Sequence, residues 1–111
     1  MGIQNWSENV VLVDLAEEPQ LGEEISSTIS MVKDRADFDV VMDFSGVDII
    51  TSSSLSKLLK LRKLLESCDH KLIFCSMSPA TKGIFKVTGL EELFEMVNDK
   101  FVALASLQLV C

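Results

Sequence analysis

The sequence has few of the residues that form disulfide frameworks or metal sites. It contains three cysteines, Cys68, Cys75 and Cys111, without a CxxC spacing, and one histidine, His70. An odd number of scattered cysteines does not indicate a disulfide framework, and these four residues form no recognisable cluster of metal ligands. We therefore expect reduced thiols in a cytoplasmic protein that holds neither a metal nor another cofactor.

Positive charge is also scarce. Ten Lys and Arg residues stand against seventeen Asp and Glu, which gives a net charge of −7 and a pI of about 4.5. Nucleic acids and anionic membranes need a basic surface, so we expect a protein or another cationic surface as the direct partner.

The sequence offers no signal for membrane insertion. The start, MGIQNW, lacks the basic and apolar segments of a signal peptide, and Trp6 stands where a myristoylation pattern has Ser or Thr. No apolar run approaches the roughly 20 residues of a membrane span. These features also favour the cytoplasm.

The 111 residues are 48% hydrophobic, which suits one domain with its own core. Short apolar runs alternate with amphipathic segments of helical period. The predicted strands are 10–15, 38–44, 71–76 and 93–97, and the predicted helices are 21–32, 53–67, 79–87 and 100–109. This alternation predicts an α/β domain built from right-handed βαβ units.

Turn and capping residues support these boundaries. Ser78 before Pro79 is a typical helix start, and Gly89 is a typical helix end. Asn98 or Asp99 is expected to cap the last helix.

Four consecutive hydroxyl residues, Thr51 to Ser54, precede the second predicted helix. A helix start needs only one capping hydroxyl, and we assign that role to Ser53 or Ser54. The others follow a predicted strand, where α/β folds often place functional residues. A phosphate here would meet the positive end of the helix dipole and unpaired backbone N–H groups.

The helix after the hydroxyl run has an unusually wide apolar face. Between Leu55 and Cys68 the apolar positions span about 220°, against the roughly 100° that a simple surface helix needs. Either this helix packs on two sides within the domain, or part of it is an exposed patch for a partner.

Two segments together carry a family resemblance. They are VVMDFSGVDIITSSSLSKLL and, later, KLIFCSMSPATKGIFKVTGLEELFEM. Their order and spacing resemble the STAS domain, in particular the bacterial anti-sigma factor antagonists. The resemblance covers about residues 10–110 and implies a single α/β domain over residues 1–111. It implies a mixed sheet of four to five strands with about four helices, packed mainly on one face.

The resemblance also implies a function. In that family a loop serine is phosphorylated by the partner anti-sigma factor, which has a histidine-kinase-like ATPase domain acting as a serine kinase. The unphosphorylated antagonist binds this partner and releases a sigma factor. By position the phosphoacceptor is Ser52, with Ser53 as the alternative. A serine phosphatase is a further candidate partner.

By the same resemblance, the residues expected to bind the partner are Thr51, Ser52, Ser53, Ser54, Leu55 and Ser56. The chain departs from the family pattern at three of them. Thr51 replaces an Asp, and Ser54 and Ser56 replace glycines. These changes support an alternative function, a STAS scaffold subunit of a stress-signalling or transport complex that is not phosphorylated.

Catalysis is not expected. A nucleophilic serine needs a base within hydrogen-bond reach, and His70 lies at the far end of the predicted helix, about 22 Å away at 1.5 Å per residue. The glycine-rich patterns GxxxxGK[ST] and GxGxxG are both absent.

Overall fold

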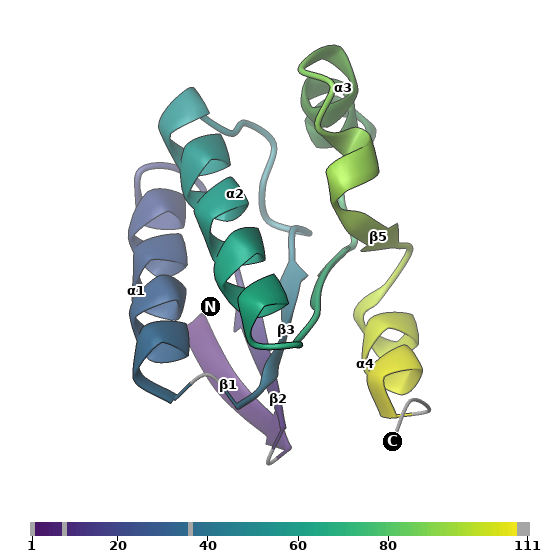
Figure 1. The fold of residues 1–111 in the computed structure, drawn as a ribbon. Coiled ribbons are helices and arrows are strands. Elements are labelled where there is room, and N and C mark those ends of the chain that lie inside the picture. The colour runs from purple at the N-terminus through teal and green to yellow at the C-terminus, as the bar shows by residue number, and fades with distance from the viewer. Residues whose placement is uncertain (1, 8, 36, 109–111) are drawn as a thin grey trace.

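The computed structural model describes residues 2–7, 9–35 and 37–108, which form one five-stranded sheet and four α-helices (Figure 1). The strands are β1 (Gly2–Ser7), β2 (Val10–Asp14), β3 (Asp39–Asp43), β4 (Leu72–Cys75) and β5 (Glu95–Val97). The helices are α1 (Gln20–Arg35), α2 (Ser52–Ser67), α3 (Pro79–Val87) and α4 (Lys100–Gln108), with a 3₁₀ turn, η1, at Glu91–Leu93. The predicted α/β class is confirmed.

The strands lie in the order β1-β2-β3-β4-β5. Strands β2 to β5 are parallel, and β1 pairs antiparallel with β2, so the sheet is mixed. Strand β1 is absent from the predicted strands. Ile3 of this edge strand is partly buried and residues 4–7 are exposed, so the strand carries almost no apolar signal.

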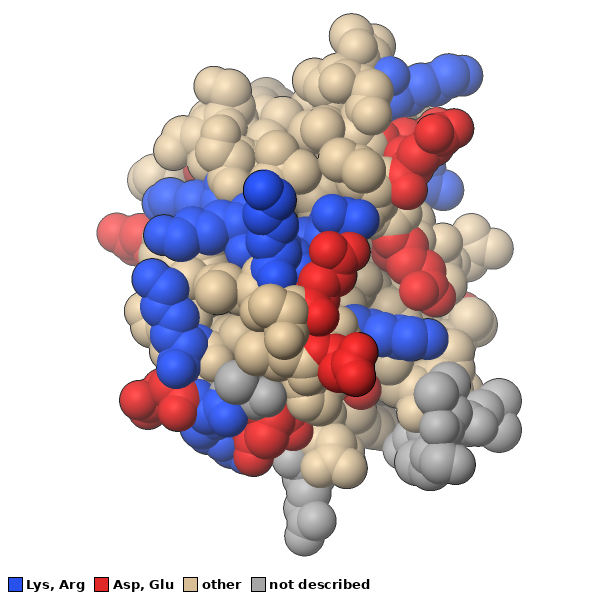
Figure 2. Space-filling view, viewed as in Figure 1, with Lys and Arg blue, Asp and Glu red and all other residues tan. Residues whose placement is uncertain are grey.

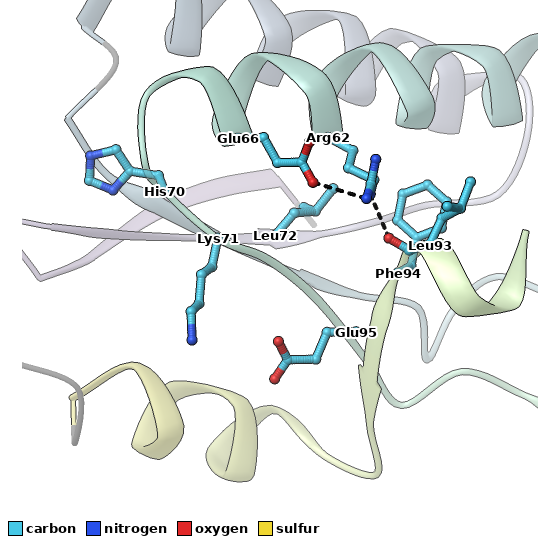
Figure 3. Close-up of a pocket in the computed structure, with 8 residues that line it drawn as sticks. All are labelled: Arg62, Glu66, His70, Lys71, Leu72, Leu93, Phe94 and Glu95. Carbon is cyan, nitrogen blue, oxygen red and sulfur yellow. Dashed lines mark hydrogen bonds and ion pairs between the residues drawn. The ribbon is translucent and has the colours of Figure 1, made fainter.

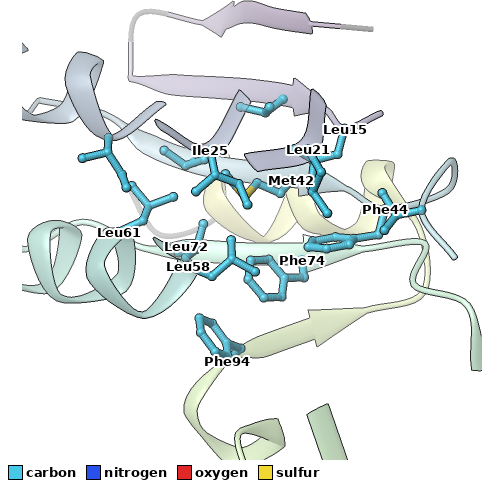
Figure 4. Packing of buried hydrophobic residues seen from close by; sticks show 14 of the residues in the cluster. Leu15, Leu21, Ile25, Met42, Phe44, Leu58, Leu61, Leu72, Phe74 and Phe94 are labelled. Atoms are coloured by element: carbon cyan, nitrogen blue, oxygen red, sulfur yellow. The ribbon is translucent and has the colours of Figure 1, made fainter. Parts of the chain in front are cut away.

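The larger core lies between the sheet and helices α1, α2 and α3. Its centre holds four phenylalanines, with Phe74 at 4.8 Å from both Phe44 and Phe94 between ring centroids, and Phe85 against Phe74 at 5.8 Å. Figure 4 shows Phe44, Phe74 and Phe94 next to one another in this layer. Aromatic contacts of this kind stabilise a core beyond the area they bury.

Among the described elements, helix α4 is the one that covers the other face of the sheet. Its Ala103, Leu104 and Leu107 are buried against residues of β2, β3 and β4. Three of the four helices therefore contribute to the opposite core, which confirms the prediction of helices mainly on one face.

The wide apolar face of α2 is used inside the domain. Leu58, Leu61 and Leu65 are almost fully buried, while Leu59 and Leu64 are partly buried and pack on the same core. The helix lies beside α1 and over the sheet (Figure 1). Packing on two sides within the domain, the first of the two alternatives, therefore explains the apolar arc.

Several predicted ends are confirmed. Ser78 caps α3, Gly89 has a φ of +76°, and Asp99 rather than Asn98 caps α4 by accepting a hydrogen bond from the Val102 N–H at 2.9 Å. Strand β5 is shorter than predicted, because η1 occupies residues 91–93. Position 109, the predicted end of the last helix, lies outside the described residues.

None of the helices in the described ranges has both the length and the hydropathy needed to cross a membrane.

Candidate functional site

The predicted site lies where α2 begins, after a loop that leaves the carboxyl end of β3. Thr51, not Ser53 or Ser54, caps this helix, so the predicted cap was wrong. Thr51 has extended backbone angles (φ −83°, ψ 161°), and its Oγ1 accepts a hydrogen bond from the Ser54 N–H at 3.2 Å. The helix starts one residue earlier than predicted, which places Ser53 and Ser54 inside its first turn.

Ser54 belongs to the interior of the domain. It is only 1% exposed, and its hydroxyl donates a hydrogen bond to Glu18 Oε2 at 2.7 Å. Oε2 also accepts hydrogen bonds from the N–H and the hydroxyl of Thr51, each at 3.0 Å. Glu18 comes from the loop between β2 and α1, so one carboxylate oxygen joins two segments that are more than thirty residues apart.

This carboxylate is ionised at neutral pH. Burial opposes ionisation and raises the pKa of Glu18, but hydrogen bonds from Ser54, from Thr51 and from the Gly22 backbone outweigh it, so the pKa lies below its usual 4.5. A negative charge near a helix N-terminus is favourable. Glu18 therefore already occupies part of the electropositive region that the sequence analysis assigned to a phosphate.

Four of the six residues assigned to partner binding are accessible. Thr51, Ser52, Ser53 and Ser56 are exposed, whereas Ser54 and Leu55 are buried. The hydroxyl run thus divides into two groups. Thr51 and Ser54 hold the structure together, and Ser52 and Ser53 present hydroxyls to the solvent on the first turn of α2.

The loop before Thr51 is fixed from the other side by α3. Thr81 is fully buried, and its hydroxyl donates to the Val47 carbonyl at 3.0 Å and, less closely, to the Asp48 carbonyl at 3.3 Å. The hydroxyls of Ser52 and Ser53 therefore stand on a segment anchored at both ends.

Ile49 is a surface residue that the sequence analysis missed. It is 69% exposed, although Val47 and Ile50 on either side are buried. The three apolar residues look alike in the sequence, and only their opposite orientations in the folded loop distinguish them. Ile49 therefore adds an exposed apolar group to the loop that precedes Ser52.

His70 is remote from this loop, as predicted. It follows α2, and its Nδ1 lies 3.0 Å from Asp39 Oδ1. It lines a pocket of about 190 Å³ where Arg62 contacts both Glu66 and the Leu93 carbonyl (Figure 3). The hydroxyl run and His70, the one histidine of the sequence, thus lie at opposite ends of α2.

A wider pocket of about 570 Å³ lies at the carboxyl ends of β2 and β3. Its charged lining consists of Asp14, Glu17, Asp43 and Lys100, and it includes none of the predicted site residues. Within the described ranges, no three His, Cys, Asp or Glu residues are arranged to hold a metal ion.

This chain is similar to known proteins in sequence. The STAS domain family matches residues 8–102. The protein named "Putative anti-sigma factor antagonist BtrV" of Bordetella bronchiseptica is 26% identical over 95 residues, which cover 86% of this chain and 78% of that protein.

Solved structures share the fold. The anti-sigma-factor antagonist (STAS) domain protein of Planctomyces limnophilus superposes with a TM-score of 0.80 at 19% identity, over 96% of this chain and 97% of the other. The Bacillus cell fate determinant SpoIIAA in its phosphorylated form gives a TM-score of 0.71 at 17% identity, over 95% and 96% of the two chains.

Proposed function

The chain belongs to the STAS domain family, and from this premise we propose that it is an anti-sigma factor antagonist switched by phosphorylation of Ser52. Its partner is an anti-sigma factor with a histidine-kinase-like ATPase domain that acts as the serine kinase, in the cytoplasm. The protein acts by binding and not by catalysis. A serine phosphatase that restores the unphosphorylated form completes the cycle.

The observation that carries this proposal is the division of the hydroxyl run. Ser52 is exposed on the first turn of α2, whereas Ser54 is buried and its hydroxyl is bonded to Glu18. A kinase can therefore reach Ser52 without opening the fold, and Ser54 is excluded as an acceptor. Ser53 is also exposed and is the alternative acceptor.

The charge near Ser52 supports a switch by repulsion. A phosphate brings about −1.5 to −2 charges at neutral pH. It would stand near the ionised Glu18 on a protein whose net charge is already −7. Because Glu18 is already bonded to the first turn of α2, the phosphate is expected to stay directed toward the solvent. There it would disrupt a closely packed interface by charge repulsion and by its cost of desolvation.

The test uses the histidine-kinase-like ATPase encoded nearest this gene as the probe. The purified protein is incubated with this ATPase and ATP, and the intact mass is measured for the wild type, Ser52→Ala, Ser53→Ala and Ser56→Ala. We expect one phosphate on the wild type and on the Ser53 and Ser56 variants, and none on Ser52→Ala. A phosphate gain that Ser52→Ala leaves intact would contradict the assignment to Ser52.

A second function is favoured by the residues around the cap. Thr51 and Ser54 stand where the resemblance expects Asp and Gly. The hydroxyls of both residues donate hydrogen bonds to Glu18. A scaffold subunit of a larger stress-signalling or transport complex needs only such a rigid surface. If Ser52→Asp binds the partner as tightly as the wild type does, the scaffold function is favoured over the switch.

A further inference from the structure

Helix α2 presents a continuous polar line to the solvent. Its residues repeat at intervals of three or four, and at 100° per residue they fall within about 80° of the helix circumference. We call this line the α2 stripe, and it consists of Ser52, Ser56, Lys60, Lys63 and Ser67, all of which are exposed. The buried leucines lie on the opposite side of the helix.

The stripe is basic on a protein that is acidic. Helix α2 carries four of the ten Lys and Arg residues of the chain but only one of its seventeen Asp and Glu residues, Glu66. In Figure 2, Lys and Arg side chains gather over the region where Figure 1 places α2. A surface of one sign on a body of the other sign attracts a charged partner in one orientation.

Two of the four cationic side chains on α2 have partners within the domain. Lys57 Nζ donates to the Gly22 carbonyl at 3.3 Å, and Arg62 contacts Glu66 and the Leu93 carbonyl. For Lys60 and Lys63 the described part of the chain supplies neither an ion pair nor a hydrogen bond. Both ammonium groups are therefore available to an external carboxylate.

We propose that the α2 stripe is a docking surface for an acidic segment of the same protein that binds the Ser52 loop. This inference rests on the function proposed above and adds the chemistry of the partner. Carboxylates on that partner would be repelled by most of this protein, whose net charge is −7, and attracted by Lys60 and Lys63. Complementary charges of this kind raise the association rate and fix the orientation of a complex.

The position of Ser52 at the head of the stripe links docking to the switch. Lys60 is eight residues further along α2, or about 12 Å along the helix axis. A phosphate on Ser52 would therefore add negative charge to the surface that the acidic segment approaches. The same electrostatics that favour the unphosphorylated complex then oppose the phosphorylated one.

The experiment compares two charge reversals of equal size. The variant Lys60→Glu/Lys63→Glu changes the stripe, and the control Lys82→Glu/Lys86→Glu changes two lysines on α3 by the same total charge. Association and dissociation rates with the histidine-kinase-like ATPase named above are measured at several salt concentrations, and thermal unfolding checks that both variants are folded.

We expect the stripe variant to bind at least about 10-fold more weakly at low salt, chiefly through slower association, with a flatter salt dependence. The control variant should change affinity by less than about 3-fold. Equal losses in the two variants, or an unchanged affinity of the stripe variant, would overturn the docking surface while leaving the proposed function in place. If the wild-type protein does not bind this ATPase, the proposed function fails and the inference fails with it.

Discussion

Helices α2 and α3 begin with the same hydrogen-bonded cap. In α2, Thr51 accepts from the Ser54 N–H at 3.2 Å, and in α3, Ser78 accepts from the Thr81 N–H at the same distance. The capping hydroxyl of α3 also donates to the Thr81 hydroxyl at 3.1 Å, and in α2 the hydroxyl oxygens of Thr51 and Ser54 lie 3.3 Å apart. In both helices the residue three positions after the cap is buried, so the two ends are built alike.

The two caps differ in what surrounds them. The Thr81 hydroxyl donates to backbone carbonyls in the interior, whereas the Ser54 hydroxyl donates to the carboxylate of Glu18, a half-buried side chain. The first two positions of α3 are Pro79 and Ala80, which carry no hydroxyl, while those of α2 are Ser52 and Ser53. A cap alone therefore does not mark a functional site; the difference lies in the exposed hydroxyls and the nearby charge.

The largest effect is expected from Thr81→Val, which keeps the backbone cap of α3 but removes the buried hydroxyl that donates to the Val47 carbonyl. The substitution keeps the shape but leaves the Val47 carbonyl without its donor in the interior, so unfolding free energy should fall by about 2 kcal/mol. Chemical denaturation measures this loss. The control Thr88→Val removes the hydroxyl of the exposed residue that follows α3. This hydroxyl donates to the Ile84 carbonyl at 2.8 Å, but water can replace it there, so the cost should be less than about 0.5 kcal/mol. Equal costs would show that the Thr81 hydroxyl has no special role.

A smaller effect is expected from Glu18→Ala, which removes the carboxylate that accepts hydrogen bonds from Thr51 and Ser54 beside the α2 cap. Water can reach this half-exposed position and replace part of the lost acceptor, so the cost in unfolding free energy should be about 1 kcal/mol. The neighbouring exposed residue provides a matched control, Glu17→Ala, which should be close to neutral. If both variants lose the same stability in chemical denaturation, the Glu18 hydrogen bonds contribute nothing.

Thr51→Asp sharpens the comparison by restoring the residue that the family resemblance expects. The new carboxylate would lie near Glu18, whose Oε2 is 3.0 Å from Thr51 Oγ1. At this exposed position the two like charges can turn apart into water, so they should cost roughly 0.5 kcal/mol beyond the effect on the cap. The cost should vanish when Glu18→Gln is also present. A double-mutant cycle measures the coupling, and additive effects would contradict it.

The smallest effect is a difference in pH dependence. The pKa of Glu18 is below 4.5 in the folded protein, so the unfolded chain binds more protons near that pH. The stabilisation by ionised Glu18 is thus complete above about 4.5 and is lost as the pH falls through the folded pKa. The stability difference between wild type and Glu18→Gln should shrink on acidification, whereas a constant difference would exclude this linkage.

Most of the fold could be predicted because its signals are local. The apolar periods of β2, β3, β4, α1 and α2, the Ser78 cap and the positive φ of Gly89 depend on residues close together in the chain. Strand β1 could not be predicted, because a polar edge strand is specified by its pairing with β2 and not by its own composition.

The candidate site was predicted as a segment but not in its detail. The sequence located the hydroxyl run at the start of α2 and singled out Ser52 by resemblance, yet it assigned the cap to Ser53 or Ser54. The error arose because all four hydroxyls can cap a helix equally well. The distinction between them comes from Glu18, which lies more than thirty residues earlier in the chain and which, among the four hydroxyl residues, accepts hydrogen bonds from Thr51 and Ser54.

By itself, the sequence determined the class of the fold, its acidic character and the place of the hydroxyl run at a helix start. Only the tertiary structure decided which hydroxyls are buried and which are exposed, and which lysines of α2 are left without a partner in the described domain. The physical reason is the separation along the chain over which each interaction acts. Periodicity and capping act over three or four residues, whereas burial and ion pairing depend on segments that only the folded chain brings together.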